Sequence, residues 1–452
     1  MNLALSLLAA SERHPDAEAL PGTTYARLRE AAARTAGGLG LERGERLAVV
    51  LDNRVETAIL YWAAQWAGAV FVPLSWRLAG QELDYCIGDC GAKLVLRDGD
   101  PLPDGDEHPG ALDLDEREPS LMLYTSGTTG RPKGVPRSHR ADRAGGLSQA
   151  LQHGYLPGDR TLGVMPLYHT MGIHSLVAMH LVGGCFVSLP RWDAGEALAL
   201  IERERITSLY LAPTLFHDLV HHPCVAQHDL SSVRALGYAG AAMTSTVVKR
   251  CAEVFDPEVF VNHYGSTELY TFSIGPDQAA KPGCAGRPAV NTRLKLEPDG
   301  EICAHLSGDE SFAGYWNRPD ADEKAIRDGW YHTGDTGHLD ADGDLWVDGR
   351  VDDMIISGGE NIHPVEVEDV LASHPRVREV AVVGAPDDRL GTRVVAVVVG
   401  DATAEELDAH CLASPLARFK RPREYRLVPA LPKSASGKIL RRVLRDESKE
   451  SL

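Results

Sequence analysis

The sequence has no run of about 18 apolar residues that could cross a membrane, and no positive charge precedes the short apolar stretch at its start. Its eight cysteines form no C-x-x-C pair and no His/Cys cluster at zinc spacing. These absences argue against a transmembrane protein, a disulfide-stapled scaffold and a zinc domain. We therefore expect a cytoplasmic protein with reduced thiols.

Positive charge is also scarce. The chain carries 46 Lys and Arg against 64 Asp and Glu, a formal net charge of -18. Nonspecific binding of nucleic acid, which depends on neutralising phosphates, is disfavoured. Any anionic ligand must therefore be met by a local basic cluster.

The pattern of strand-like and helix-like segments divides the chain into two parts. Residues 46–100 alternate strand-like and helix-like segments, and the same rhythm returns further along, which is typical of parallel α/β sheets. From about residue 340 short alternating strands predominate. We predict an α/β protein with a large multi-sheet domain at residues 1–350 and a smaller α+β domain at 351–452.

The strongest local signal is LMLYTSGTTGRPKGV at residues 121–135. An apolar strand breaks into a loop of Ser, Thr and Gly, followed by Lys133. Backbone N–H groups, hydroxyls and a cation together suit a phosphate chain. The loop is not a Walker A motif, because Lys133 is followed by Gly134 where that motif needs Ser or Thr. The alternative interpretation is a flexible surface loop.

This loop resembles the signature of the adenylate-forming superfamily, which includes acyl- and aryl-CoA synthetases. Four further family motifs follow in order: YGSTE (264–268), YHTGD (331–335), GRVDDMIISGGENIHPVEVE (349–368) and PKSASGK (432–438). MPLYHTMG (165–172), DDMIISGGENIHP and FKRPREY most resemble the halobenzoate:CoA ligases. The resemblance implies the adenylate-forming fold with a mobile C-terminal lid. It also implies an acid:CoA ligase that uses ATP, Mg²⁺ and coenzyme A.

The chemistry of such a reaction explains the residue types. A carboxylate must first acquire a good leaving group, and transfer to the α-phosphate of ATP makes AMP that group. Lys133 would neutralise the phosphates, and Glu268 is a hard oxygen ligand suited to Mg²⁺. The resemblance assigns the β- and γ-phosphates to Thr125, Ser126, Gly127, Thr128, Thr129 and Gly130.

The nucleoside has its own candidates. Asp335 would accept both ribose hydroxyls, and Arg350 could reach the same sugar. Small residues and one ring would bracket the adenine, at Gly240, Ala241, Ala242 and Tyr264. The neighbours His263, Gly265 and Thr267 complete this predicted cofactor-binding set.

Two features of the C-terminal part would act at the same α-phosphate, one during adenylation and the other during thioester formation. The resemblance makes Lys438 the adenylation lysine, suited to an oxygen that becomes more negative as pyrophosphate leaves. Gly358 and Gly359 would line the tunnel for the pantetheine thiol, although they also suit a turn before the helix opened by Pro364. The small domain must therefore rotate, and Asp352 matches the family hinge.

The resemblance also suggests where the thiol and the acid bind. For CoA the basic candidates are Arg421, Arg423 and Arg77, but Leu390 stands where the halobenzoate ligases carry a Trp that could stack on adenine. The resemblance also makes His169 a catalytic residue, expected between the acid site and the approach of the thiol. The predicted acid pocket comprises His169, Gly172, His174, Tyr238, Ala239, His263, Gly265, Leu269 and Tyr270.

That pocket favours a flat aryl acid of the benzoate type. It holds aromatic and small residues, and it has no Lys or Arg to pair with a second carboxylate. A medium-chain or alicyclic acid, and a carrier-protein pantetheine as acceptor, remain open alternatives. An inactive adenylate-binding protein is disfavoured, because Lys133, Glu268, Asp335 and Lys438 are all present. The sequence also leaves a homodimer open.

Overall fold

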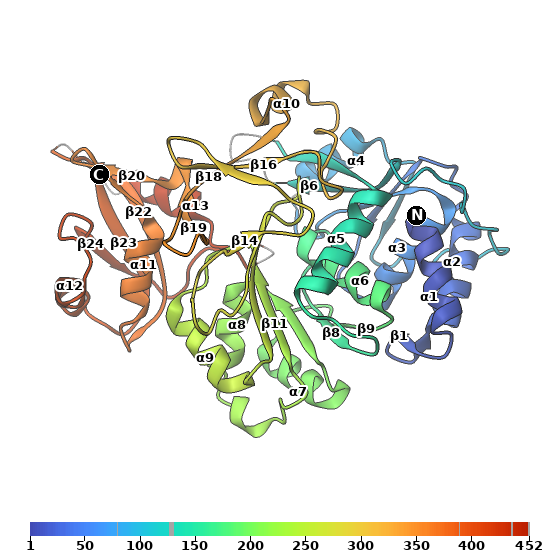
Figure 1. Ribbon diagram of the computed structural model, residues 1–452, viewed down its shortest axis with the longest axis horizontal. Helices are drawn as coiled ribbons and strands as arrows, with labels where there is room; N and C mark the ends of the chain where they lie inside the picture. The colour runs from blue at the N-terminus through green and yellow to red at the C-terminus, as the bar shows by residue number, and fades with distance from the viewer. Residues whose placement is uncertain (79, 126–130, 388, 435–436, 451–452) are drawn as a thin grey trace.

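The computed structural model describes residues 1–78, 80–125, 131–387, 389–434 and 437–450 (Figure 1). The predicted phosphate-binding residues Ser126, Gly127, Thr128, Thr129 and Gly130 lie outside these residues. All eight cysteines are free thiols. Within the described residues, none of the helices is long and apolar enough to cross a membrane.

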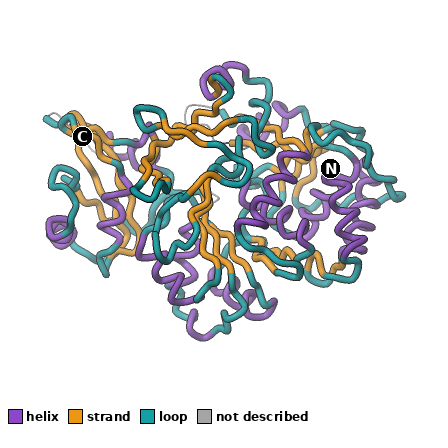
Figure 2. The backbone as a smooth tube through the Cα atoms, viewed as in Figure 1, coloured by secondary structure: helices purple, strands orange, loops and turns teal. Residues whose placement is uncertain are grey.

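The first sheet lies in the N-terminal part of the chain, where strands run through the middle with helices beside them (Figure 2). Its strands are β3 (Arg46–Val50), β4 (Val70–Pro73), β5 (Leu94–Arg97), β6 (Pro119–Thr125) and β7 (Lys133–Ser138). The order is β5-β3-β4-β6-β7, and only β6 and β7 pair antiparallel. Strand β4 is buried along its whole length, as expected when helices cover both faces of a parallel sheet.

The helices of this region confirm the predicted strand–helix–strand alternation. Helix α3 connects β3 to β4 and ends at Gly68, whose φ of +73° permits the left-handed turn. The region contains α1 (Leu3–Arg13), α2 (Tyr25–Leu39), α3 (Val55–Ala67), α4 (Gly80–Cys90), α5 (His139–Gln152), and a short pair of strands, β1 (Glu18–Leu20) and β2 (Thr23–Thr24).

The second sheet has the order β14-β13-β12-β11-β10-β8-β9. Strands β8 to β12 pair in parallel and the last two pair antiparallel. The strands are β8 (Arg160–Gly163), β9 (Cys185–Ser188), β10 (Ser208–Leu211), β11 (Ala235–Ala239), β12 (Val259–Tyr264), β13 (Ser273–Gly275) and β14 (Arg287–Pro288). Its helical segments are α6 (Thr170–Val182), α7 (Ala194–Glu204), α8 (Pro213–Val220), α9 (Ser245–Phe255) and the 3₁₀ turn η1 (Val225–Gln227).

A third, antiparallel sheet leads toward the C-terminal part. It contains β15 (Leu294–Leu296), β16 (Glu301–His305), β17 (Ile326–Arg327), β18 (Trp330–Leu339) and β19 (Leu345–Arg350), with α10 (Pro319–Ala325) before β17. Strands β18 and β19 form a hairpin in which Asp335 is the register partner of Arg350. The short 3₁₀ turn η2 (Val351–Asp353) follows directly.

The smaller C-terminal domain, at the left of Figure 1, has its own core. It contains β20 (Ile355–Ser357), β21 (Glu360–Ile362), α11 (Pro364–Ala372), β22 (Val377–Asp387), β23 (Gly391–Gly400), α12 (Ala404–Ala413), β24 (Glu424–Leu427) and α13 (Arg441–Glu450). Val382 and Ala396 of the sheet pack with Val367 and Leu371 of α11. The predicted fold class is confirmed, whereas the exact boundary at residue 350 stays a prediction.

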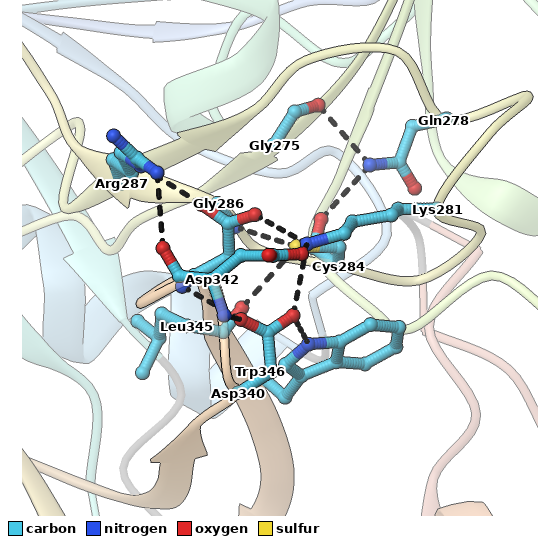
Figure 3. Close-up of polar contacts among 11 residues, drawn as sticks. Gly275, Gln278, Lys281, Cys284, Gly286, Arg287, Asp340, Asp342, Leu345 and Trp346 are labelled. Atoms are coloured by element: carbon cyan, nitrogen blue, oxygen red, sulfur yellow. Dashed lines mark hydrogen bonds and ion pairs between the residues drawn. The ribbon is translucent and has the colours of Figure 1, made fainter.

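A cluster of charges ties the tip of the β18–β19 hairpin to the second sheet (Figure 3). Lys281, between β13 and β14, places its Nζ 3.0, 2.6 and 2.7 Å from carboxylate oxygens of Asp340, Asp342 and Asp344. The indole of Trp346 donates a further hydrogen bond of 3.0 Å to Asp340. We call Lys281, Asp340, Asp342 and Asp344 the Lys281 clamp. The clamp holds one end of a hairpin whose other end carries Asp335 and Arg350.

Candidate active site

Lys133 and Glu268 meet around a tyrosine. The β6–β7 hairpin sets Lys133 opposite Thr125, at the two ends of the predicted phosphate loop. The Lys133 ammonium lies 3.9 Å from the centroid of the Tyr315 ring. Burial lowers the pKa of Lys133, and the negative charge of Glu268 opposes that shift. The predicted counter-charge and the predicted metal ligand therefore lie close enough to interact.

Tyr315 also positions the carboxylate. Glu268 is only 6% exposed, and the Tyr315 hydroxyl donates a hydrogen bond of 2.6 Å to its Oε1. Tyr315 was not predicted from the sequence, because no spacing rule links it to YGSTE. The GYW tripeptide at 314–316 was the only signal available.

The predicted ribose residues come together as well. Arg350 Nη1 lies 2.9 Å from Asp335 Oδ1, and the Tyr264 hydroxyl donates a hydrogen bond of 2.6 Å to Asp335 Oδ2. Burial raises the pKa of Tyr264, so its hydroxyl stays protonated. The predicted adenine segment 240–242 is exposed directly after β11 and begins at Gly240, whose φ is +85°.

Lys438 of the small domain reaches this group. The Thr214 hydroxyl of α8 donates a hydrogen bond of 3.2 Å to the Gly437 carbonyl, which holds the lysine loop against the large domain. Lys438 remains exposed to solvent, yet desolvation by the protein around it lowers the pKa of its ammonium. Asp335 opposes this shift, and the positive charge of Arg350 adds to it. Lys438 is thus within electrostatic reach of Asp335 and Arg350, the residues predicted to bind the ribose.

His169 lies near the same lysine, at the N-cap of α6. Burial lowers the pKa of His169 to about 4, and the charge of Lys438 adds to this effect. Its Nδ1 is buried with no hydrogen-bond partner among the described residues. The imidazole is therefore neutral at pH 7 and free to contact a ligand.

The glycine turn and the hinge are placed differently. Gly358 and Gly359 connect β20 to β21 with φ of +60° and +87°. The Gly358 N–H donates a hydrogen bond of 2.9 Å to the Leu390 carbonyl inside the small domain. In this conformation Lys438, and not the glycine turn, lies near Asp335 and Arg350, which are predicted to bind the nucleotide. Asp352 lies within η2, between the β18–β19 hairpin and β20, and its side chain is outside the description.

Several predicted acid-pocket residues form an aromatic group. The His174 ring stacks on Tyr270 with centroids 3.6 Å apart and planes at 20°. The Tyr270 hydroxyl donates a hydrogen bond of 2.6 Å to Gln149. His263 Nδ1 lies 3.1 Å from His153 Nε2, and burial lowers the pKa of His263 to about 3. The His263 and Tyr270 rings also pack together, with centroids 4.7 Å apart and planes at 55°, and all three rings are almost completely buried.

Other predicted pocket residues serve the packing around these rings. The Tyr238 hydroxyl donates a hydrogen bond of 2.5 Å to Gln278 in the core. A Cβ at Gly172 would lie 2.2 Å from the Pro166 carbonyl oxygen, and one at Gly265 would lie 1.8 Å from that of Tyr270. These glycines permit close backbone approach. Ala239 and Leu269 are buried, and the hydroxyl of Thr267 lies 3.0 Å from that of Thr170.

The three arginines predicted for CoA do not form one group. Arg421 forms an ion pair with Asp408 inside the small domain. Arg423 is exposed on the same domain, and its N–H donates to the Val394 carbonyl. Arg77 lies on the large domain, with its guanidinium 4.9 Å from the centroid of the Trp76 ring.

A buried arginine that no motif predicted supports the YGSTE loop. Arg137 forms an ion pair of 2.9 Å with Asp142, and both side chains are almost completely buried. Its two remaining guanidinium nitrogens donate to the carbonyls of Thr267 at 2.9 Å and Glu310 at 3.0 Å. In the sequence, PRSHR looks like an ordinary basic surface segment, so no local signal marked this role.

Comparisons with known proteins give a consistent result. The family model described as AMP-binding enzyme matches residues 7–316, and that of the AMP-binding enzyme C-terminal domain matches residues 366–438. A 4-chlorobenzoate–CoA ligase of Arthrobacter is 34% identical over 99% of this chain and 95% of its own. A long-chain-fatty-acid–CoA ligase of Mycobacterium tuberculosis is 33% identical over 94% and 93%.

A solved structure agrees with these sequence relatives. The anthranilate CoA ligase AuaEII, in complex with anthranoyl-AMP, matches with a TM-score of 0.91 and 26% identity, over 100% of this chain and 98% of its own.

Proposed function

The chain belongs to the AMP-binding enzyme family, and on that premise we propose that it is an AMP-forming acid:CoA ligase acting on benzoate-type aryl acids. The carboxylate attacks the α-phosphorus of ATP, so that acyl-AMP forms and pyrophosphate leaves. The CoA sulfur then attacks the acyl carbon and releases AMP, and the thiol proton passes to solvent. The products are a thioester, AMP and pyrophosphate.

The observation that carries this proposal is the place of Lys438. A lysine of the small domain lies within electrostatic reach of Asp335 and Arg350 of the large domain, and also of His169. Its pKa is lowered because desolvation and Arg350 disfavour the charge. An anionic oxygen at the α-phosphate would relieve this deficit. The charge on Lys438 would therefore be used most fully in the transition state of adenylation.

The other end of the ATP would lie along Lys133 and Glu268. Lys133 is half-buried beside Tyr315 and has a positive charge to offer to the leaving pyrophosphate. Glu268 fits Mg²⁺, because it is a buried hard oxygen donor whose other oxygen Tyr315 holds in place. Mg²⁺ bound there would screen the phosphate charges. Asp335, held by Tyr264 and Arg350, would accept the ribose hydroxyls.

The second step requires a domain rotation. Lys438 and the Gly358–Gly359 turn share one domain, and only the lysine is at the nucleotide residues in this conformation. We propose that residues 351–452 rotate as a unit about Asp352 after adenylation. The glycine turn would then replace the lysine loop and leave room for the pantetheine arm.

We propose that the aromatic cluster of His174, Tyr270 and His263 borders the acid pocket, and an aryl acid suits a border of rings. The low pKa of His263 keeps its ring neutral, so this histidine offers no positive charge to a second carboxylate. The relatives with 4-chlorobenzoate and anthranilate in their names support the same substrate class. The fatty-acid relative keeps the medium-chain alternative in the test.

The test is pyrophosphate release with ATP and Mg²⁺ over a panel of acids, with and without CoA. We expect benzoate, 4-chlorobenzoate and 2-aminobenzoate to give the highest kcat/KM, above cyclohexanecarboxylate, decanoate and malonate. Apolar pockets distinguish such acids by about 1 to 3 kcal/mol for each methylene-sized change, so the preference will be graded. A tenfold preference for decanoate or malonate would refute the aryl assignment.

The acceptor and the assembly need their own measurements. Mass spectrometry of the product separates CoA thioesters from acyl groups on a carrier-protein pantetheine, which is the alternative acceptor. Light scattering on the purified protein measures its molar mass in solution and shows whether it forms the homodimer that the sequence leaves open. A cytoplasmic location stays part of the proposal and is tested by fractionation of the producing cells.

A further inference from the structure

Four side chains that can bind a transition metal lie together on the third sheet. Glu297 directly follows β15, Glu301 and Cys303 lie on β16, and His332 lies on β18. Glu297, Cys303 and His332 each bring one ligand atom within 4.8 Å of the other two. None of the four belongs to the residues proposed above to bind ATP, acid or CoA.

The pairing of β16 with β18 brings the ligand atoms together. Cys303 and His332 are register partners, and Cys303 Sγ lies 3.4 Å from His332 Nδ1. In a tetrahedral zinc site a sulfur and a nitrogen ligand stand roughly 3.5 Å apart, because their bonds to the metal are about 2.3 and 2.0 Å long. The spacing of these two atoms therefore already matches zinc. Glu301 Oε2 lies 2.7 Å from the same nitrogen, close enough to supply a further ligand.

The cluster is sheltered from water. Cys303 is fully buried, and the side chains of His332 and Glu301 are mostly buried. Burial raises the pKa of the Cys303 thiol to about 11, and the charges of Glu301 and Glu297 add to this effect. The thiol is therefore protonated in the metal-free protein. A divalent cation among these groups would stabilise the thiolate and displace that proton.

The donor atoms select the kind of metal. One sulfur, one imidazole nitrogen and carboxylate oxygens suit Zn²⁺, whereas Mg²⁺ and Ca²⁺ prefer oxygen ligands alone. The three aspartates of the Lys281 clamp are also close together, but they offer only oxygen and already surround an ammonium (Figure 3). Within the part of the chain that the structure describes, the cluster around Cys303 is thus the better site for a transition metal.

A further hydrogen bond orients the glutamate beside His332. The Gly334 N–H donates a hydrogen bond of 3.2 Å to Glu301 Oε1, while Oε2 faces the imidazole. Carboxylates that bind metals are commonly held by such a second contact, which fixes their orientation. Gly334 directly precedes Asp335 on β18. A metal bound here would join β16 to β18 next to the residue predicted to bind the ribose.

One cation already contacts the cluster. Lys295 Nζ lies 2.5 Å from Glu297 Oε1, and both side chains are partly exposed. Ion pairs in such positions are weak, because water screens the charges and two flexible side chains must be held in place. Lys295 is therefore a competitor that a divalent ion can displace from Glu297.

We propose that Glu297, Cys303 and His332 bind one Zn²⁺ ion, with Glu301 as the fourth ligand. Binding forms a bond between zinc and the Cys303 sulfur, breaks the S–H bond and releases the proton to the buffer. His332 binds through Nδ1 and carries its proton on Nε2. No electron is transferred, and the site is independent of the proposed ligase activity.

Cobalt provides a direct probe, because Co²⁺ bound to a thiolate has a charge-transfer absorption band that carboxylate and imidazole ligands do not produce. Co²⁺ is titrated into the metal-free full-length protein without ATP and is then displaced with Zn²⁺. We expect one equivalent of Co²⁺ to produce the thiolate band, and Zn²⁺ to abolish it, because zinc binds such sites more tightly. Cys303→Ser should abolish the band. Glu297→Gln, a change at a partly exposed position, should weaken Zn²⁺ binding at least about tenfold.

Cys224→Ser is the matched control. Cys224 is the half-buried cysteine of the chain, and it belongs to no such cluster among the described residues. Its substitution should leave the cobalt band unchanged. A wild type without the band, a band that survives Cys303→Ser, a band lost in Cys224→Ser, or unchanged Zn²⁺ affinity in Glu297→Gln would each overturn the site.

Removal of the competing lysine should have the opposite effect. Lys295→Gln frees Glu297 from its ion pair, so Zn²⁺ should bind about two- to fivefold more tightly, the scale of an exposed ion pair. Because a ligand that binds only the folded state stabilises it, Zn²⁺ should also raise the Tm of the wild type and leave that of Cys303→Ser unchanged. Weaker Zn²⁺ binding in Lys295→Gln, or an equal rise of Tm in Cys303→Ser, would contradict the proposed ligands. Neither measurement uses a substrate, so failure of the ligase assignment would not affect them.

Discussion

Two lysines of this chain have opposite electrostatic surroundings. Lys281 is held by three aspartates, and these hydrogen bonds raise its pKa, with Asp342 the largest contributor (Figure 3). Lys438 lies where desolvation and the charge of Arg350 lower its pKa, with only partial compensation from Asp335. Three carboxylates stabilise the charged form of Lys281, whereas the surroundings of Lys438 disfavour its charged form.

The difference separates a structural charge from a chemical one. Lys281 gains nothing from a further anion, because three carboxylates already surround it, and its effect is to fix the β18–β19 hairpin. Lys438 is stabilised by any anion that arrives, so ATP binding and phosphate transfer would supply its missing partner. An unsatisfied charge between two domains is thus a better indicator of reactivity than a salt-bridged cluster.

The largest effect should follow the removal of the unsatisfied charge. Lys438→Ala should lower the adenylation rate 100- to 1000-fold, or about 3 to 4 kcal/mol, because one transition-state charge contact is lost. Thioester formation from supplied acyl-AMP should change little. Single-turnover measurements of both half-reactions check this. Lys281→Ala is the contrasting variant, and equal losses in the two half-reactions of Lys438→Ala would contradict the assignment.

Amine reactivity should reveal the two pKa shifts directly. Only a neutral amine attacks an acylating reagent, and the lowered pKa of Lys438 gives it a larger neutral fraction at pH 8 than the raised pKa allows for Lys281. With brief exposure to acetic anhydride, peptide mass spectrometry should find Lys438 labelled at least about tenfold faster. ATP with Mg²⁺ should protect Lys438 and leave Lys281 unchanged. Equal labelling would remove the contrast.

The sequence predicted one side of this comparison better than the other. The family motifs predicted roles for Lys438, Asp335 and Arg350, and the alternating apolar segments expected from about residue 340 include the strand that carries Arg350. Lys281 gave no signal, because its partners lie about 60 residues away and become neighbours only when the hairpin folds back on the second sheet. Long-range contacts between side chains of ordinary type leave no periodicity to detect.

The same reason explains the residues that were missed inside the site. Tyr315 reaches Glu268 across 47 positions, and Arg137 reaches Thr267 across 130. Each is a single side chain satisfying a distant polar group, so neither belongs to a local pattern. Motifs predicted the groups that would contact ATP, whereas the side chains that hold those groups had to be found in the structure.

Lys133 lies between the two extremes, since it has one ring and one carboxylate nearby. Tyr315→Phe keeps the ring under its ammonium and deletes the hydrogen bond to Glu268. A lost hydrogen bond to a buried charged group costs about 1.5 to 3 kcal/mol, so we expect a rise of roughly tenfold or more in the Mg²⁺ concentration needed for half-maximal adenylation. Magnesium titrations of the two proteins measure this. An unchanged titration would show that Tyr315 does not position the carboxylate.

The smallest kinetic effect should come from the satisfied charge. Lys281→Met leaves three carboxylates with oxygens within 4.8 Å of one another and the Arg287 guanidinium, 2.9 Å from Asp344, as their remaining counter-charge among the described residues, so the hairpin tip should loosen and the Tm should fall. The kcat for adenylation should stay within twofold, with at most a modest rise in the KM for ATP through Asp335 and Arg350 at the other end of the hairpin. Lys281→Arg, which keeps the charge, should restore most of the Tm.

The pH dependence of stability provides a second check. The pKa of Asp340 is lowered by its hydrogen bonds, first that of Trp346 and then those of the Asp344 backbone and Lys281. Its stabilising contribution is therefore present above the pKa that the residue has in the unfolded chain, and it is lost as the pH falls. The Tm difference between wild type and Lys281→Met should therefore be constant near neutrality and shrink below about pH 4, where unfolded aspartates take up protons. A large loss of kcat with an unchanged Tm would mean that this cluster, too, takes part in the chemistry.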